Sequence, residues 1–316
     1  MTFRTPIKNT EIHKRQTPLN YQSKIGLFGS CFVENIGEKL SYFKFKNFVN
    51  PYGILFNPKA IEKALTDIVQ QRFYEKSDLV FENERWHSLH HHSDFSNAKL
   101  SIILEDINQS IHKTHQDLQE ASHLIITLGT AWVYHHIASD QLVANCHKIP
   151  QNNFIKRILS VAEITKNLKE IITLARQINP SIQLLFTLSP VRHLKDGIIE
   201  NSQSKAQLLT AIHQVVSDLE VDYFPSYEII LDDLRDYRFY KSDMLHPNQT
   251  AIDYIWGVFK NSWISDESYS IMQQVDKVQK ALEHKAFNPD SEQYKNFISQ
   301  LNQQKEALKK SHNILF

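Results

Sequence analysis

Glycine is the residue type that this sequence uses most sparingly. Its seven glycines are about 2% of 316 residues, whereas an average protein contains roughly 7%. This scarcity excludes a collagen-like repeat and argues against glycine-rich linkers and repeated tight hairpins. We therefore expect the glycines that are present to lie where the backbone itself requires them.

Cysteine, net charge and long apolar runs are also scarce. Two cysteines cannot form a disulfide framework, so we expect a reducing compartment, the cytoplasm. The 35 basic and 35 acidic residues cancel, so bulk charge gives no reason to expect a nucleic-acid partner. No run approaches the ~18 apolar residues of a membrane span, and residues 1–15 lack the apolar core of a secretory signal.

The hydrophobic residues, 41% of the chain, fall into runs of strand length separated by helical patterns. We expect strands over residues 24–28, 43–49, 123–128, 182–187 and 221–224. Most of these runs are continuously apolar, which favours a parallel sheet buried on both faces. Helices are expected over residues 34–41, 58–71, 100–121, 161–178, 202–219 and 249–262. This alternation predicts an α/β fold, a three-layer α/β/α sandwich of the flavodoxin-like type with a mostly parallel five-stranded sheet.

The pattern changes at about residue 264. Apolar residues then recur at helical spacing in two stripes, Ile271, Val275, Val278 and Leu282, and Tyr294, Phe297, Leu301 and Leu308. We predict a helical hairpin that packs on the main domain or on another subunit, which makes it a candidate homodimer surface. The predicted domains are residues 1–263 and 264–316.

The first expected strand ends in the run Gly29-Ser30-Cys31-Phe32. A serine where a strand ends and a helix begins is well placed to be a nucleophile, because helix N-terminal N–H groups favour developing negative charge. The alternative is an ordinary serine that caps the helix. Cys31 is a rival nucleophile with an intrinsically more reactive thiolate. We favour Ser30, because the residue after a strand-end serine usually points into the helix packing.

A second candidate site lies before the last core helix, in residues 242–247, Ser-Asp-Met-Leu-His-Pro. An aspartate three residues before a histidine can accept the imidazole Nδ1–H, which leaves Nε2 free as a general base. We expect Pro247 to start the helix and stiffen the turn. The alternative is a loop that contains Asp243 and His246 by chance.

The serine and the Asp-x-x-His pair together resemble the SGNH/GDSL hydrolase superfamily. Residues 29–33, Gly-Ser-Cys-Phe-Val, resemble the signature of the GSCFA family, with Val33 where alanine is usual. Other blocks similar to that family's are residues 50–58, 128–132, 145–148, 189–193 and 243–247. The resemblance implies a triad with Ser30 as nucleophile, His246 as base and Asp243 as its orienting partner.

The same resemblance implies an oxyanion hole with donors from the N–H groups of Ser30 and Gly53. The third block of the superfamily usually reads Gly-x-Asn and supplies the asparagine side chain. Here the residue at that position is Ala131, and one lost donor costs about 10²–10³ in rate. The Thr130 hydroxyl is the expected replacement, and Asn50 is another candidate.

Further residues are candidates for substrate binding. Gly129 and Trp132 belong to the third block. Arg192 and His193 follow the fourth strand at the same end of the sheet as Ser30, where they could bind a carboxylate or a phosphate. The alternative for Arg192 is an ion pair with Asp196.

Aromatic and histidine residues gather in an insertion between the second and third strands. Trp86 either walls the substrate pocket there or simply packs. The histidines at 87 and 90–92 lack the spacing of a specific metal site, so we expect a solvated or pocket-lining loop and no metal. Residues 146–148, Cys-His-Lys, are expected to lock a loop or, as the alternative, to contact substrate.

The leading prediction is a serine ester hydrolase that forms a covalent acyl-enzyme. Its substrate would be a small acyl ester, for example an O-acetyl group on a carbohydrate, or another glycan or lipid ester. An acyltransferase with the same triad is the close alternative. A non-catalytic scaffold with a relict site is the third, suggested by Ala131 and the C-terminal hairpin. Glycine motifs for binding phosphate are absent, and no cofactor is expected.

Overall fold

Five parallel strands form the central sheet of the computed structural model, which describes residues 17–284 and 287–316. The strands, in chain order, are β1 (Lys24–Gly29), β2 (Lys46–Val49), β5 (His123–Leu128), β9 (Gln183–Leu188) and β10 (Asp222–Phe224). Their order across the sheet is β10-β9-β5-β1-β2, and every pairing is parallel. The five predicted strands and the predicted α/β fold are confirmed.

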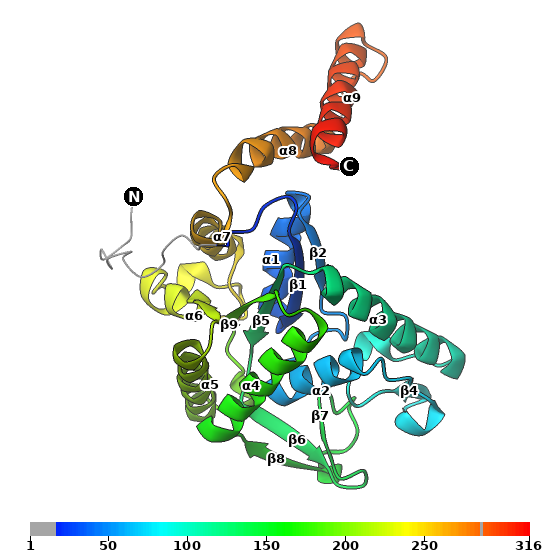
Figure 1. The fold of residues 1–316 in the computed structure, drawn as a ribbon, viewed down its shortest axis with the longest axis vertical. Coiled ribbons are helices and arrows are strands. Elements are labelled where there is room, and N and C mark those ends of the chain that lie inside the picture. Colours follow the sequence, from blue (N-terminus) through cyan, green and yellow to red (C-terminus); the bar gives the residue numbers. More distant parts are fainter. Residues whose placement is uncertain (1–16, 285–286) are drawn as a thin grey trace.

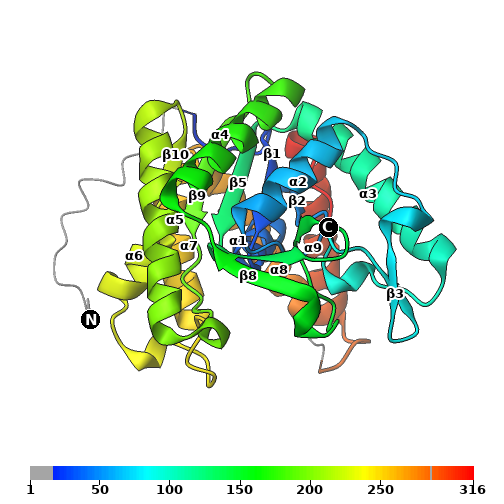
Figure 2. The same cartoon turned by 90° about the horizontal axis from the view of Figure 1, so that it is seen from below.

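Helices cover both faces of this sheet and complete three layers (Figures 1 and 2). One face carries α2 (Pro58–Val69), α3 (Leu100–Glu120), α4 (Val161–Ile178) and α5 (Ile198–Asp218). The other face carries α1 (Cys31–Tyr42) and α7 (Gln249–Trp263). Neighbouring side chains of β1 enter opposite cores, since Leu27 packs with α1 and α7 whereas Phe28 packs with α2 to α5. The predicted sandwich is therefore confirmed.

Three elements start three or four residues away from the predicted positions, each because of local backbone geometry, and β9 and β10 start one residue late. Helix α1 starts directly after Ser30, which already has the extended backbone of a capping residue. Helix α5 starts four residues early, after Gly197, whose φ of 111° favours glycine. Strand β2 starts three residues late, because residues 43–45 form the turn after α1, with Lys44 at a positive φ.

Two small antiparallel sheets lie outside the predicted elements. Strand β3 (Val80–Glu82) pairs with β4 (Arg85–His87). Strand β6 (Trp132–His136) lies between β7 (Gln141–Val143) and β8 (Phe154–Ile158), beyond the carboxyl end of β5 (Figure 1). These strands are three to five residues long, and β4, β6 and β8 contain histidine, lysine or arginine, so no apolar run marks them in the sequence.

Short helical turns connect the longer elements. They are Lys76–Asp78, Ser93–Phe95, Gln151–Asn153, Leu194–Asp196, α6 (Ser226–Glu228), the π-helical turn Ile229–Asp233, and Tyr237–Phe239. Within the described residues, no helix combines the length and the apolar character needed to cross a membrane.

The predicted C-terminal hairpin is present as α8 (Ser268–Glu283) and α9 (Glu292–His312). Helix α8 packs on the main domain at the C-terminal end of α1. There the Tyr42 hydroxyl donates to Asp276 at 2.9 Å, and the Gln279 side chain donates to the Tyr42 carbonyl at 2.8 Å. Apolar residues of α8, and Leu301 and Leu308 of α9, belong to the same cluster as the core of α1 and α7, and α9 projects away from the sheet (Figure 1). The hairpin is thus attached to the main domain, and a dimer through it stays a prediction.

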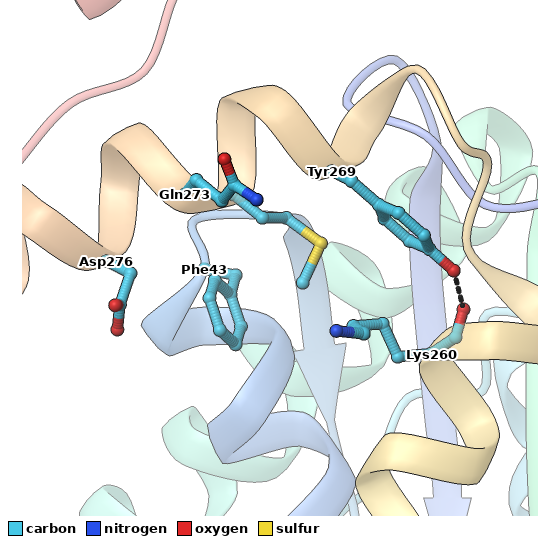
Figure 3. Close-up of a pocket in the computed structure, with 6 residues that line it drawn as sticks. Phe43, Lys260, Tyr269, Gln273 and Asp276 are labelled. Carbon is cyan, nitrogen blue, oxygen red and sulfur yellow. Dashed lines mark hydrogen bonds between the residues drawn. The ribbon is translucent and has the colours of Figure 1, made fainter.

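A groove of about 260 Å³ lies between α8 and the main domain (Figure 3). It is lined by Phe43, Lys260, Tyr269, Met272, Gln273 and Asp276. Phe43 follows the C-terminal end of α1, whereas Ser30 directly precedes the N-terminal end. A helix of this length spans roughly 18 Å, so the groove is separate from the surroundings of Ser30.

Candidate active site

The turn between β1 and α1 places Ser30 at the carboxyl edge of the sheet. Gly29, the last residue of β1, has a φ of 135°, and a Cβ at this position would collide with the carbonyl oxygen of Thr127 on β5. Gly29 therefore lies where the backbone requires glycine. Ser30 follows as the N-cap of α1, and its N–H donates to the same Thr127 carbonyl at 3.1 Å.

The Ser30 hydroxyl is buried and has no hydrogen-bond partner among the described residues. It does not cap α1, which distinguishes it from Ser160, whose Oγ accepts the N–H of Glu163 at the start of α4. The interpretation of Ser30 as an ordinary capping serine therefore does not hold. Its oxygen lies instead beside the first turn of α1, whose N–H groups have no carbonyl partner within the helix.

Asp243 and His246 form a hydrogen-bonded pair on the loop before α7. Asp243 Oδ2 accepts from His246 Nδ1 at 2.7 Å, and Oδ1 accepts the N–H groups of Leu245 and His246 at 2.8 and 3.0 Å. These backbone N–H groups are the main reason that the pKa of Asp243 is lowered to about 2, with the imidazole bond adding to it. The contact fixes the ring of His246 and leaves Nε2 free.

The cap of α7 is Asn248 and not Pro247. Asn248 Oδ1 accepts the N–H of Ala251 at 3.2 Å, and its Nδ2 donates to the carbonyl of Arg238 at 2.6 Å. The helix begins at Gln249. The prediction that Pro247 starts the helix is wrong, because the next side chain can supply the N-cap oxygen that proline lacks.

Ser30 and the Asp243–His246 pair each precede one of two adjacent helices, α1 and α7. Helices α1 and α7 share one core, and Lys39 of α1 pairs with Asp253 of α7 at 2.5 Å. Ser30 is fully buried, whereas the side chains of Asp243 and His246 are 43% and 41% exposed. No hydrogen bond joins Ser30 to His246 in the part of the chain that the structure describes. A direct bond between them requires the loop to move.

The ordered blocks of this site match a known family. The model of the GSCFA family matches residues 24–259, well over half of the chain. A second model, the C-terminal domain of GSCFA domain proteins, matches residues 275–315. The chain belongs to the GSCFA family.

Solved structures add two remote likenesses to the GSCFA match. One is a protein from Streptococcus pneumonia provisionally assigned as a platelet activating factor, with 11% identity and a TM-score of 0.42 over 76% of this chain and 83% of that chain. The other is a carbohydrate esterase family 3 from Talaromyces cellulolyticus, with 10% identity and a TM-score of 0.38 over 81% of this chain and 99% of that chain. No curated protein matches the chain. The family assignment therefore rests on the two GSCFA models.

The second GSCFA block folds against the turn after β1. Gly53, which has a φ of 72°, donates its N–H to the carbonyl of Asn50 at 2.7 Å. Asn50 Oδ1 accepts the N–H of Gly29 at 2.9 Å, and its Nδ2 donates to Glu34 at 3.3 Å. The N–H groups of Ser30 and Gly53 and the side chain of Asn50, all expected as oxyanion donors, thus have partners within the protein.

The third GSCFA block is held against α5. Thr130 Oγ1 lies 3.1 Å from Ser204 Oγ, and the N–H of Ala131 donates to the same Ser204 oxygen at 2.7 Å. The N–H groups of Gly129 and Thr130 donate to the carbonyl of Phe56 at 2.7 and 2.9 Å. The Ala131 methyl is fully buried in the hydrophobic core. The Thr130 hydroxyl, the expected replacement donor, is therefore engaged in holding this block.

Lys205 on α5 is a site residue that the sequence analysis missed. Its side chain is buried, and Nζ donates to the carbonyls of Gly129 and Ser189 at 2.7 Å each, beyond the ends of β5 and β9. Burial lowers the pKa of Lys205 to about 7. The signal was available, because Lys205 falls on the buried stripe of α5 between Asn201 and Leu208.

Arg192 is exposed beside the His246 loop. Its guanidinium lies 6.0 Å from the centre of the Tyr240 ring. Both residues line a cavity of about 400 Å³, which Met244 of the Asp243–His246 loop also lines. The alternative that Arg192 pairs with Asp196 is wrong, because Lys156 of β8 occupies that carboxylate at 2.5 Å.

His193 lies deeper at the same edge of the sheet. Its Nε2 is buried and has no hydrogen-bond partner among the described residues, and it would lie 3.2 Å from a Cβ placed on Gly129. The ring meets that of Phe56 edge-on at 5.2 Å. Burial, and then the charge of Lys205, lower the pKa of His193 to about 4, so the ring is neutral at physiological pH.

Cys31, the rival nucleophile of the GSCFA signature, is a half-buried free thiol. Burial raises the pKa of Cys31, the nearby Glu34 carboxylate adds to the rise, and the positive charges of Lys205 and Lys241 oppose it. A raised pKa disfavours the thiolate, so Ser30 remains the proposed nucleophile.

Two tryptophans expected near substrate lie in the small sheets. The Trp86 ring packs against Phe81 at 4.9 Å and lies 5.5 Å from Lys76 Nζ, within its own insertion. Trp132 opens β6, where its ring lies 4.5 Å from the Nζ of Lys156. These contacts account for Trp86 as a packing residue and place Trp132, the last residue of the third GSCFA block, at the start of β6.

The histidine insertion is a buried layer and not a solvated loop. His91 is fully buried and stacks on Tyr52 at 4.0 Å, and its Nδ1 lies 2.8 Å from Ser88 Oγ. His147 donates from Nε2 to the carbonyl of Ser88 at 2.7 Å. Residues 146–148 thus lock their loop onto this insertion, as expected. Among residues 17–284 and 287–316, no group of histidine, cysteine and acidic side chains is arranged to hold a metal ion.

Proposed function

We propose that this GSCFA protein is a serine ester hydrolase of the SGNH type that acts on a small acyl ester, such as an acetyl group on a carbohydrate. One observation carries the proposal. A buried serine hydroxyl without a partner lies at the N-terminus of α1, and an imidazole oriented by Asp243 stands at the start of the adjacent helix. Nucleophile, base and orienting carboxylate are the three parts of a serine hydrolase triad.

In the proposed reaction, Ser30 Oγ attacks the acyl carbonyl carbon while His246 Nε2 takes the hydroxyl proton. Asp243 stays ionised, since its pKa is lowered to about 2, and stabilises the imidazolium. The tetrahedral intermediate collapses, and the alcohol leaves with the proton from His246. Water, deprotonated by His246, then attacks the acyl-Ser30 ester and releases the acid.

The substrate is expected to enter beside the His246 loop. The cavity there is lined by Arg192, Tyr240 and Met244, and the exposed Tyr237 lies at the same cavity. Aromatic faces and an exposed guanidinium suit a polar, ring-shaped alcohol such as a sugar. Binding in this cavity would bring the loop and the ester together above Ser30.

The test is turnover of p-nitrophenyl acetate by the purified protein and by two matched variants. Ser30→Ala should lose at least 10³-fold in kcat, because no nucleophile remains. Cys31→Ala, at the next position, should retain activity within a few-fold. Equal rates for wild type and Ser30→Ala would remove Ser30 from the mechanism. A loss in Cys31→Ala alone would make the thiol the nucleophile.

Two other functions remain as outcomes of this test. An acyltransferase would show faster acyl transfer to an added sugar or lipid alcohol than to water. One observation supports a non-catalytic scaffold. The N–H groups of Ser30 and Gly53 and the Thr130 hydroxyl already have hydrogen-bond partners within the protein. Wild-type turnover equal to buffer, together with no labelling of Ser30 by an organophosphate, would support the scaffold.

A further inference from the structure

An ester hydrolase needs hydrogen-bond donors aimed at the oxygen that becomes negative in the transition state. The four donors expected here are engaged elsewhere, and the side-chain amide of Asn50 donates to Glu34. The N–H of Ser30 bonds to β5, the N–H of Gly53 bonds to Asn50, and the Thr130 hydroxyl contacts Ser204. Ala131, at the position that would carry a side-chain amide, turns its methyl into the core. A donor is therefore required from another residue.

His193 has the one feature that these groups lack. Its Nε2 is buried and without a hydrogen-bond partner among the described residues. Buried polar atoms are normally paired, so an unpaired one at a candidate site needs an explanation. Among the described residues, Ser30 Oγ, the proposed nucleophile, is also buried and unpaired at this edge of the sheet, as is the hydroxyl of Thr127 near the end of β5.

A short run of contacts connects the surroundings of Ser30 with His193. The carbonyl of Gly29, next to Ser30, accepts the N–H of Leu55 at 3.0 Å. The following residue, Phe56, holds the Gly129 N–H with its carbonyl and meets the His193 ring edge-on. Gly129 in turn faces His193 Nε2 without a Cβ between them. The absence of this Cβ keeps space open in front of Nε2.

The neighbours of His193 favour its neutral imidazole, which can donate a hydrogen bond while it keeps its proton. Lys205 on α5 and His246 on the catalytic loop both disfavour a positive charge on the ring, and Asp196 favours it. Burial prevails together with these two neighbours, so the imidazole is neutral and carries one N–H. A neutral imidazole can donate a hydrogen bond to a developing oxyanion while keeping its proton.

We propose that His193 Nε2–H is an oxyanion donor for the ester attacked by Ser30, with Lys205 as the residue that positions it. This inference rests on the proposed hydrolase function. As Ser30 Oγ bonds to the carbonyl carbon, the carbonyl π pair moves to oxygen and the Nε2–H donates to it. No proton moves to or from His193. When the carbonyl re-forms, the alcohol leaves with the proton held by His246.

Lys205 positions this donor through the backbone. Its Nζ donates to the carbonyl of Gly129, which faces His193, and to the carbonyl of Ser189. Ser189 directly follows β9, and His193 lies four residues further along the chain. His193 itself is anchored to α5, because its N–H donates to Asn201 Oδ1 at 2.9 Å. The buried stripe of α5 thus fixes both sides of the space in front of Nε2.

The experiment compares His193→Phe, which keeps a planar ring but has no donor, with His193→Gln, which keeps an N–H. Turnover of p-nitrophenyl acetate by His193→Phe should fall 10²–10³-fold in kcat with KM changed less than about threefold. The kcat of His193→Gln should be at least tenfold higher than that of His193→Phe. His213→Gln, an exposed histidine on the same helix as Lys205, serves as the matched control and should keep wild-type kcat.

The pH profile distinguishes a donor from a base. His193→Phe should keep the rise of kcat between about pH 5 and 8 that a histidine base produces, at a lower level, whereas His246→Gln should lose it. Loss of the rise in His193→Phe would overturn the inference and make His193 the base. A kcat for His193→Phe within threefold of wild type would overturn it as well.

The rate at which diethyl p-nitrophenyl phosphate modifies Ser30 gives a second readout that does not need turnover. The phosphoryl oxygen also gains charge during attack, so His193→Phe should slow labelling at least tenfold and His193→Gln less. Equal labelling rates contradict His193 as donor while the hydrolase function stands. If Ser30→Ala hydrolyses the acetate as fast as wild type, the proposed function itself fails.

Discussion

Ser30 differs from the other capping residues of the protein in what its side chain does. Asn57, Ser160, Asn248 and Ser291 each accept an N–H at the start of their own helix. Ser30 has the same extended backbone, yet its oxygen makes no such bond. A buried polar atom without a partner destabilises the folded state, so this position is better suited to chemistry than to stability.

We therefore expect Ser30→Ala to leave the free energy of unfolding unchanged or to raise it by up to about 1 kcal/mol, because it removes an unpaired buried oxygen. The matched control is Ser160→Ala, which breaks the capping box with Glu163 and should cost about 1 kcal/mol. Urea unfolding followed by circular dichroism measures both. A loss in Ser30→Ala as large as that in Ser160→Ala would show that this hydroxyl stabilises the fold.

Asp243 allows chemistry and stability to be separated in another way. Asp243→Asn can still accept the N–H groups of Leu245 and His246 through Oδ1, so the loop should keep its shape and the melting temperature should change little. The amide can hold the imidazole in the wrong tautomer, so kcat should fall about 10²–10⁴-fold. Steady-state esterase kinetics with matched thermal melts measure both effects.

Asp276→Asn is the control for this variant. The Asp276 carboxylate also accepts hydrogen bonds, from Tyr42 and Lys280, but it lies at the opposite end of α1 from Ser30. Its substitution should leave kcat unchanged. Wild-type kcat in Asp243→Asn would contradict the orienting role of this carboxylate.

Among the elements, the sequence predicts those whose burial is continuous. Strands such as β5 and β9 are buried along almost their whole length and are mostly apolar, because helices cover them on both sides. Strands β6 and β8 are five residues long and each has a single buried side chain, Val133 and Phe154, so no apolar run marks them in the sequence. Their formation depends on pairing with each other, which the local sequence does not encode.

In the site, too, contacts between residues close in the sequence could be predicted, whereas contacts between distant residues could not. The Asp243–His246 contact spans three residues, so spacing alone predicts it. The partners that engage the expected oxyanion donors come from far along the chain: Thr127 for Ser30, and Ser204 for Thr130. Which hydroxyl or N–H remains free is decided by packing of these distant elements, so the free Nε2 of His193 could be found only in the structure.

A substitution in the β1–α1 turn can test whether the backbone requires glycine at position 29. In Gly29→Ala the Cβ would collide with the Thr127 carbonyl at a φ of 135°, so we expect a loss of roughly 2–4 kcal/mol. Gly257→Ala is the matched control, since nothing lies within 4 Å of a Cβ there and the residue is inside α7. It should gain up to about 1 kcal/mol. Urea midpoints measure both, and a tolerated Gly29→Ala would contradict the requirement for glycine at this turn.

Across the whole molecule, several histidines are buried without charge, and they join the insertion to the site. Burial lowers the pKa of His91 well below its ordinary value, and that of His147 to about 4. The same insertion carries His92, whose N–H donates to the carbonyl of Tyr52 at 2.9 Å and whose Cβ leaves no room for a side chain on Gly53. Protonation of these histidines would therefore loosen the layer that supports the second GSCFA block.

The sign of the pH effect follows from proton uptake. An unfolded histidine binds a proton below about pH 6.5, whereas His147 in the folded protein does so only near pH 4, so the unfolded state binds more protons in between. The stabilising contribution of His147 is complete above pH 6.5 and is lost as the pH falls toward 4, by roughly 3 kcal/mol at full effect. We expect the urea midpoint to decrease steadily from pH 7 to pH 4.5. His147→Gln, which can still donate to Ser88, should flatten this dependence, while the exposed His213→Gln should not. A midpoint that stays constant over this range would mean that the buried histidines protonate freely in the folded state.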